Sequence, residues 1–456
     1  MATEHEPVRP VDAPATRAAL GAVALRDAIA TGLVSTEQAV TDCLERIRDV
    51  DASVEAWAFL GPEHVLEQAR ALDEHRRQGR PLGRLHGVPV AIKDIIDVRG
   101  MPTGDGTVLH EGRIPRQDAA LIRRLRADGA IVLGKTVTTE LATYAPGKTR
   151  NPHNPAHTPG GSSSGSAAAV ASYMAPLAVG TQTNGSVIRP AAYCGVYGYK
   201  PTFGMIPRSG VLRQSRPLDQ VGVMGRSIED IALIAETLTG YDEDDPATQL
   251  TARPPLLETS RQEVPLEPRF AFIKAPAWDR TSPDTQEAFA ELVEHLGGSV
   301  TEVELPATFL QAVAWHKTIM EADLARSFAQ EYDEGRDKLS ASLRGQIERG
   351  REVRAVDYLN CVDRIPLLNR VLDEIFGEYH AILTPATLGT APRFEEGTGD
   401  PIYCTLWTLC GTPALTLPLL QGENGMPLGV QLVGQRMDDA RLLRTARWLE
   451  KSVRSA

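Results

Sequence analysis

Apolar residues recur at helical spacing in the first part of the chain. Val40, Leu44 and Ile47 follow one another at intervals of four and three residues, and residues 35–38 have the composition of a capping box that begins a helix. The pattern predicts an amphipathic helix here and a mostly helical N-terminal region over residues 1–80.

Short apolar runs replace this pattern in the next part of the chain. Residues 88–92 and 131–133 have the composition of buried strands, and residues 118–127 between them have the spacing of a helix. Strand-like runs return at 381–383 and 414–417. Strands that alternate with helices are typical of an α/β sheet, which is the fold class that we predict.

The strand patterns are interrupted in the second half of the chain. Residues 241–268 are rich in proline and acidic residues, which is typical of an exposed connection. The patterns that follow are mainly helical until strands resume in residues 376–456. We therefore interpret about 250–375 as a mostly helical insertion that shapes the substrate pocket. The whole chain, 1–456, is then a single domain whose core is residues 81–240.

Charge and cysteine content narrow the classes of function. The chain has 48 Lys and Arg residues against 59 Asp and Glu residues, a net charge of -11, which disfavours direct binding to nucleic acid or to an anionic membrane. Its start is polar and proline-bearing, and no apolar run reaches the roughly 18 residues that a membrane helix needs. Five scattered cysteines indicate neither a zinc site nor a disulfide framework. We expect a soluble, cytoplasmic protein.

Two short motifs match well-known expressions by letter. Residues 129–136 fit the phosphate-loop pattern GxxxxGK[ST], but residues 130–133 are apolar and typical of a strand whose amides are used in a sheet. Residues 161–165 fit GxSxG, the pattern of a nucleophile elbow, with Ser163 as the nucleophile. A nucleophile elbow follows a buried strand, but the proline-rich residues 151–159 do not have the composition of a strand. We reject ATP binding and keep the elbow as an alternative.

A lysine stands at the end of an apolar run. Lys93 directly follows residues 88–92 and precedes Asp94. Burying an ammonium group costs several kcal/mol unless it is paired or loses its proton, and a desolvated lysine can act as a base. Taken alone, Lys93 is more simply interpreted as a residue that reaches solvent or pairs with Asp94.

Two segments rich in glycine and serine accompany this lysine. Residues 158–171 have the sequence TPGGSSSGSAAAVA, and residues 180–191 have the sequence GTQTNGSVIRPA. Together with GVPVAIKD at 87–94 and PLGVQLVG at 427–434, these segments resemble, in the same order, the motifs of the amidase signature family of serine hydrolases. The resemblance covers nearly the whole chain after its start and weakens between about 250 and 375.

The resemblance implies a fold and a reaction. The fold is a central mixed, twisted β-sheet covered by helices on both faces, and the reaction is cleavage of a C–N bond. The catalytic groups are a serine nucleophile, a serine preceded by a cis peptide, and a lysine, which by motif position are Ser186, Ser162 and Lys93. Neutral Lys93 would draw a proton from Ser162 while Ser162 draws one from Ser186. An acyl-enzyme would then form on Ser186.

Attack on an amide carbonyl creates an oxyanion that needs hydrogen-bond donors. The backbone amides of Thr183, Asn184, Gly185 and Ser186 are the candidates, because they lie in the nucleophile loop and Gly185 permits close approach. The reaction requires neither a metal ion nor an organic cofactor, so we expect none.

The sequence departs from the family pattern at several positions. Many members have aspartate at the position of Gln182 and arginine at that of Ile188, so both charges are lost together. Arg189 follows, and it either holds a substrate carboxylate, as in the malonamidase-like branch, or braces the loop. Asn184 replaces the usual glycine or alanine, and Asp105 is an unexpected acid near the site, for which we expect a solvated turn position.

The motifs indicate the reaction but not the substrate. They are most similar to the malonamidase, aryl-amidase and urethanase-like branches, so the main expectation is a small-molecule amide or carbamate bound near Arg189, Tyr144, Trp315 and Trp407. A homodimer is the family-level expectation, with neither nucleic acid nor a membrane as partner. The alternative is an amidotransferase A-type subunit that releases ammonia from glutamine within a multi-subunit complex.

Overall fold

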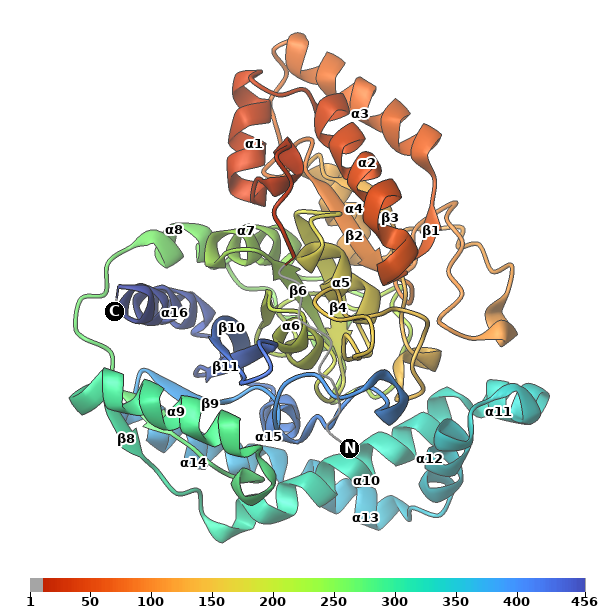
Figure 1. Cartoon of the computed structure of the whole chain (residues 1–456). Coiled ribbons are helices and arrows are strands. Elements are labelled where there is room, and N and C mark those ends of the chain that lie inside the picture. Colours follow the sequence, from red (N-terminus) through yellow and green to blue (C-terminus); the bar gives the residue numbers. More distant parts are fainter. Residues whose placement is uncertain (1–10, 456) are drawn as a thin grey trace, which may run out of the picture.

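One large sheet organises the molecule. The computed structural model describes residues 11–455, so most of the polar start predicted for residues 1–14 lies outside the described residues. Within that range, eleven strands join in the order β1-β3-β2-β4-β6-β5-β10-β11-β9-β7-β8 (Figure 1). The strands are β1 (Trp57–Leu60), β2 (Pro89–Lys93), β3 (Ile131–Thr136), β4 (Leu177–Gln182), β5 (Tyr197–Lys200), β6 (Gln220–Gly225), β7 (Phe270–Phe272), β8 (Val300–Glu302), β9 (Ala381–Pro385), β10 (Ala414–Gln421) and β11 (Pro427–Val433).

Sixteen α-helices within the described range surround this sheet. They are α1 (Ala22–Thr31), α2 (Thr36–Val54), α3 (Pro62–Arg77), α4 (Ala120–Ala127), α5 (Ser164–Ala171), α6 (Ile188–Tyr193), α7 (Ile228–Leu238), α8 (Leu256–Arg261), α9 (Pro283–Leu296), α10 (Ala312–Ser327), α11 (Ala329–Gly335), α12 (Ala341–Arg351), α13 (Ala355–Val362), α14 (Ile365–Glu378), α15 (Ile402–Cys410) and α16 (Asp439–Arg454). The helix predicted to follow residues 35–38 begins at Thr36, and both halves of its capping box are formed.

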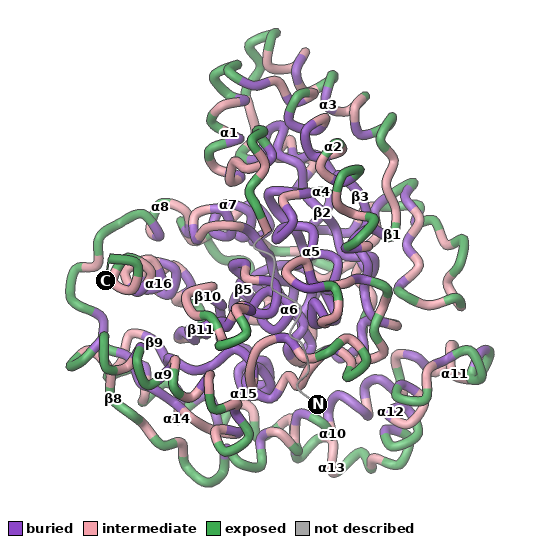
Figure 2. Tube along the Cα trace, in the orientation of Figure 1, coloured by how far each residue is buried: buried purple, intermediate pink, exposed green. Residues whose placement is uncertain are grey.

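The sheet is mixed and buried on both faces. β2 pairs in parallel with β3 and β4, whereas β4 pairs with β6 in the antiparallel direction. Val90 and Ile92 of β2 belong to the core that includes α7 and α16, while Ala91 between them belongs to the core that includes the alanine-rich α5. Alternate side chains of a strand point to opposite faces, so helices cover both. The predicted α/β fold with a mixed sheet is confirmed, and Figure 2 shows its buried centre around α5, α6 and the strands beside them.

The segment predicted as a helical insertion also contributes strands. β7 and β8 lie inside residues 250–375 and extend the sheet in parallel beyond β9. Each has only three residues, which is too short for a period of two to stand out in the sequence. After β8, the helices α10 to α13 lie together on one side of the molecule (Figure 1).

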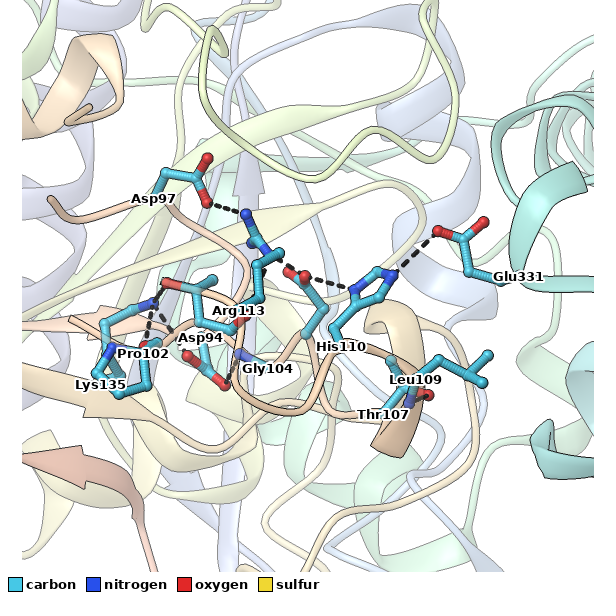
Figure 3. A network of polar contacts seen from close by, with 12 residues as sticks. Asp94, Asp97, Pro102, Gly104, Thr107, Leu109, His110, Arg113, Lys135 and Glu331 are labelled. Carbon is cyan, nitrogen blue, oxygen red and sulfur yellow. Dashed lines mark hydrogen bonds and ion pairs between the residues drawn. The ribbon is translucent and has the colours of Figure 1, made fainter. Parts of the chain in front are cut away.

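A partly buried ionic cluster links a core loop, residues 105–113, to this group of helices. Asp105 is 1% exposed, so the expectation of a solvated turn residue is wrong. Its carboxylate accepts hydrogen bonds from His110 Nδ1 (2.8 Å) and from Arg113 (3.0 Å). The other nitrogen of His110 lies 3.1 Å from a carboxylate oxygen of Glu331 on α11 (Figure 3). The hydrogen bonds to Asp105 and Glu331 raise the pKa of His110 to about 9, so the imidazolium form bridges the two carboxylates at neutral pH.

We predict that His110→Gln lowers the free energy of unfolding by about 1 kcal/mol near neutral pH, because a partly solvated ionic bridge is lost. The folded-state pKa of His110 is above its ordinary value of 6.5. The contribution is therefore complete below the ordinary value and disappears as the pH rises through about 9. Urea unfolding of both proteins at about pH 6 and about pH 10 measures this. An equal difference at the two pH values would contradict it.

Candidate active site

Three segments meet at the carboxyl ends of two parallel strands. Lys93 ends β2, Ser186 lies in the loop between β4 and α6, and Ser162 lies just before α5. Because β2 and β4 are parallel neighbours, their carboxyl ends lie at the same edge. α5 packs against both strands, which brings the serine loop to that edge.

Lys93 is completely buried and faces hydroxyl groups. Its Nζ lies 2.7 Å from Ser162 Oγ and 2.8 Å from Thr181 Oγ1. Asp94, the next residue, instead pairs with Lys135 at 3.0 Å (Figure 3). The simpler interpretation, in which Lys93 reaches solvent or pairs with Asp94, is therefore wrong. Within residues 11–455, no carboxylate forms an ion pair with Lys93.

This environment favours the neutral amine. Burial lowers the pKa of Lys93 well below its ordinary value of 10.5, and the negative charge of Asp219 opposes this effect only in part. Burial also raises the pKa of Asp219 to about 6. A neutral lysine that touches a serine hydroxyl can accept its proton, which is the property of a general base.

The loop that carries Ser162 is held in place by hydrogen bonds from the side chain of Arg189. The peptide bond between Gly161 and Ser162 is cis. The guanidinium of Arg189 donates to the carbonyl of Gly161 (2.7 Å) and to that of Gly399 (2.7 Å). Of the two roles considered for Arg189, these contacts are those of a brace. Its Nε is buried and has no partner among the described residues.

Ser186 opens onto a small cavity. Its backbone carbonyl accepts a hydrogen bond from the amide of Ser163 (3.3 Å), which places the nucleophile loop against the serine loop. Among the described residues, the Ser186 hydroxyl has no hydrogen-bond partner, so the predicted contact between Ser186 and Ser162 is not formed in this structure. The Ser163 hydroxyl instead donates to the carbonyl of Thr181 (3.3 Å). Ser163 is thus engaged inside the fold, which disfavours the elbow alternative.

The backbone of residues 183–186 uses its carbonyls, but not its amides, in hydrogen bonds to the protein. Within residues 11–455, none of these four amides donates to a protein acceptor. Each carbonyl, in contrast, accepts a hydrogen bond; the donors are His316 for Thr183, Thr408 for Asn184, the Arg189 amide for Gly185 and the Ser163 amide for Ser186. Buried amides are almost always paired. Four free amides in succession can stabilise an oxyanion.

One member of this arrangement was not assigned a role from the sequence. His316 on α10 is buried, and burial lowers its pKa to about 4, so the ring is neutral near pH 7. Its Nε2 lies 2.9 Å from the carbonyl of Thr183 and must carry the proton, because a carbonyl only accepts. No local motif marks His316 in the sequence, since its partner lies far away along the chain.

The cavity beside Ser186 has fewer aromatic residues than expected. Tyr144 lines it, and its hydroxyl accepts a hydrogen bond from the side chain of Asn184 (3.1 Å). Trp407 is in the core, and Trp315 packs under Arg364 with 5.7 Å between the guanidinium and the ring centre. Neither tryptophan lines this cavity. Its apolar wall is instead formed by two residues of α10, Met320 and Leu324.

Comparison with known proteins decides the family. A family model described as Amidase matches residues 38–443, most of the chain. The chain belongs to the amidase family. Its fold agrees: the peptide amidase from Stenotrophomonas maltophilia superimposes with a TM-score of 0.83 and 28% sequence identity, covering 97% of this chain and 98% of that one. The geometry at Lys93 and Ser162 thus lies in an amidase-family enzyme that acts on C–N bonds.

Curated relatives of this amidase-family chain share one name. The glutamyl-tRNA(Gln) amidotransferase A-type subunit of Thermobifida fusca is 34% identical, and the match covers 95% of this chain and 96% of the relative. The protein of the same name from Symbiobacterium thermophilum is also 34% identical, with the same coverage. The finer resemblance to malonamidase, aryl-amidase and urethanase-like branches receives no support from these relatives.

The partner prediction is wrong. The sequence patterns led us to expect a small-molecule amide or carbamate, no nucleic acid, no membrane and a homodimer. The relatives are instead named as one subunit of an amidotransferase, and their name includes a tRNA. The net charge of one chain cannot reveal a connection with tRNA, because an acidic chain can work in an assembly whose other members bind the nucleic acid. Separately, no helix within residues 11–455 has the length and apolar character needed to cross a membrane.

Proposed function

We propose that this amidase-family chain is an amidotransferase A-type subunit that releases ammonia from glutamine within a multi-subunit complex. The relatives that match nearly the whole chain are named as such subunits, and the site has the groups needed to hydrolyse a carboxamide. The observation that carries the chemistry is the 2.7 Å contact between the buried Lys93 amine and the Ser162 hydroxyl.

In the proposed mechanism Ser186 is the nucleophile. Its hydroxyl turns from the cavity towards Ser162, and Lys93 receives the Ser162 proton as Ser162 receives that of Ser186. Ser186 Oγ then bonds to the carboxamide carbon, and the carbonyl oxygen becomes an oxyanion held by the free amides of residues 183–186. The C–N bond breaks, the proton passes through Ser162 to the leaving ammonia, and water hydrolyses the ester on Ser186.

The cavity offers hydrogen-bonding groups that suit a carboxamide. Gln346 Oε1 and Arg189 Nε are buried without partners among the described residues, and both residues line the cavity beside Ser186. Unpaired buried polar groups cost free energy until a ligand satisfies them. A primary carboxamide carries both an N–H donor and a carbonyl acceptor. A polar amide substrate such as glutamine therefore offers a partner for each of these two groups.

The first prediction from this proposal concerns the three catalytic groups. Ser186→Ala should abolish glutamine hydrolysis, and Ser162→Ala and Lys93→Ala should each lower kcat by at least about a thousandfold, because groups that act as a unit are lost together. Ammonia release measures this. Ser172→Ala, which removes a buried hydroxyl beyond the end of α5, is the matched control and should keep wild-type activity. Wild-type rates for Ser186→Ala would contradict the assignment.

The second prediction concerns pH. The base must be neutral, and the pKa of Lys93 is lowered from 10.5 by burial. We expect kcat/KM to rise with pH along one ionisation with a midpoint below 10.5 and then to level off. Below that midpoint Lys93 is protonated and cannot accept the Ser162 proton. A profile without this ionisation, or one that falls as the pH rises through it, would contradict the role of Lys93.

The third prediction tests the assembly. The purified chain is assayed alone and after co-expression with the remaining subunits of an A-type amidotransferase, with glutamine, a p-nitroanilide and a nitrophenyl carbamate as substrates. We expect the chain to co-purify with those subunits and glutamine hydrolysis to rise at least about tenfold in the complex. Faster turnover of the anilide or the carbamate by the isolated chain would show that it is a stand-alone hydrolase.

A further inference from the structure

The orientation of the free amides depends on what holds their carbonyls. A peptide unit is planar, and in the trans form its C=O and N–H point in opposite directions. A donor that fixes the carbonyl of Asn184 therefore also fixes the direction of the Gly185 amide. That donor is the hydroxyl of Thr408, which comes from α15 in the C-terminal part of the chain.

The hydroxyl of Thr408 is in turn held by Gln182. The Gln182 Oε1 accepts from the amides of Val187 (2.8 Å) and Ile188 (3.0 Å) at the start of α6. Its Nε2 donates to Thr408 Oγ1 at 2.9 Å. The direction of the Gln182 amide is not arbitrary, because backbone N–H groups can only donate and must face its oxygen. Gln182 and Thr408 are both fully buried, so water does not compete.

Together these hydrogen bonds fix the direction in which the Thr408 hydroxyl donates its proton. Thr408 Oγ1 accepts from Gln182, and its one proton is directed to the carbonyl of Asn184. A carboxylate at position 182 could still accept from Val187 and Ile188, but it has no N–H. It would accept the Thr408 proton instead and leave the Asn184 carbonyl without a donor.

We infer that Gln182 and Thr408 are positioning residues for the oxyanion site, and that Gln182 sets the direction of the Thr408 hydroxyl. This inference rests on the proposed role of Ser186 and residues 183–186. The inference explains why glutamine is suitable at position 182, where many members of the family have aspartate. The side-chain oxygen of Gln182 accepts from both amides at the start of α6, and its Nε2 supplies the donor that orients Thr408.

The test uses a reagent that needs no knowledge of the substrate. A fluorophosphonate forms a bond from Ser186 Oγ to phosphorus and loses fluoride, and its phosphoryl oxygen occupies the oxyanion site. The labelling rate, followed by intact-mass spectrometry of the full chain, therefore reports the activation of Ser186. The assay contains no glutamine. It therefore still tests the roles of Gln182 and Thr408 if the chain proves not to hydrolyse glutamine.

We expect Thr408→Val and Gln182→Glu each to slow labelling by about tenfold, which is less than the loss of a whole oxyanion donor, because the Gly185 amide is misdirected and not removed. Thr408→Ser restores the hydroxyl and should label within about twofold of wild type. Thr412→Val is the matched control, since the Thr412 hydroxyl also donates to a backbone carbonyl, that of Trp407 (3.2 Å), near the same end of α15. It should label at the wild-type rate.

Thermal unfolding separates orientation from folding. Thr408→Val loses two buried hydrogen bonds and Thr412→Val loses one. Both melting temperatures should therefore fall, that of Thr408→Val further, while at a temperature well below both transitions only Thr408→Val loses labelling. Labelling of Thr408→Val at the wild-type rate would overturn the inference. It would equally be overturned if Thr412→Val slowed labelling as much, or if Thr408→Ser labelled no faster than Thr408→Val, because packing and not the hydroxyl would then be responsible.

Discussion

The burial of one lysine without a carboxylate is the constraint on which the site depends. Lys93 is 0% exposed, and the groups at its Nζ are hydroxyls. An ammonium ion in that position would lose its hydration with little return, so the neutral amine is favoured. A neutral amine can accept a proton, and the hydroxyl nearest to it is that of Ser162, at 2.7 Å.

Strand geometry keeps the neighbouring charge away from this amine. Asp94 follows Lys93 in the chain, but it lies on the other side and pairs with Lys135 of β3. That pair is itself buried, and Thr103 and the amide of Gly104 complete its hydrogen bonds. A buried pair of this kind is stable only when its remaining polar groups are satisfied. The charge of Asp94 is thus balanced by Lys135 and not by Lys93.

Sequence patterns predicted the elements with local signals and missed those without them. The capping box before α2 and the strands β2 and β3 depend on neighbouring residues, so spacing was sufficient. β7 and β8 are three-residue strands, and only their place at the edge of the sheet defines them. In the site, the motif residues come from contiguous segments. His316, Thr408 and Gln346 come from distant helices, so only the packed fold brings them to residues 183–186 and the cavity.

The two tryptophans expected in the pocket, Trp315 and Trp407, lie elsewhere. An apolar residue on a helix is equally suited to core and pocket, and the energy of burial is non-directional. Trp407 and Thr408 are adjacent on α15, yet the tryptophan fills the core while the threonine reaches the backbone of Asn184. Adjacent residues of a helix project from different sides of it, so the packing of α15 decides which of the two side chains reaches the site. A polar residue in such a position carries more information about function than its larger apolar neighbour, because most buried hydroxyls have a specific partner.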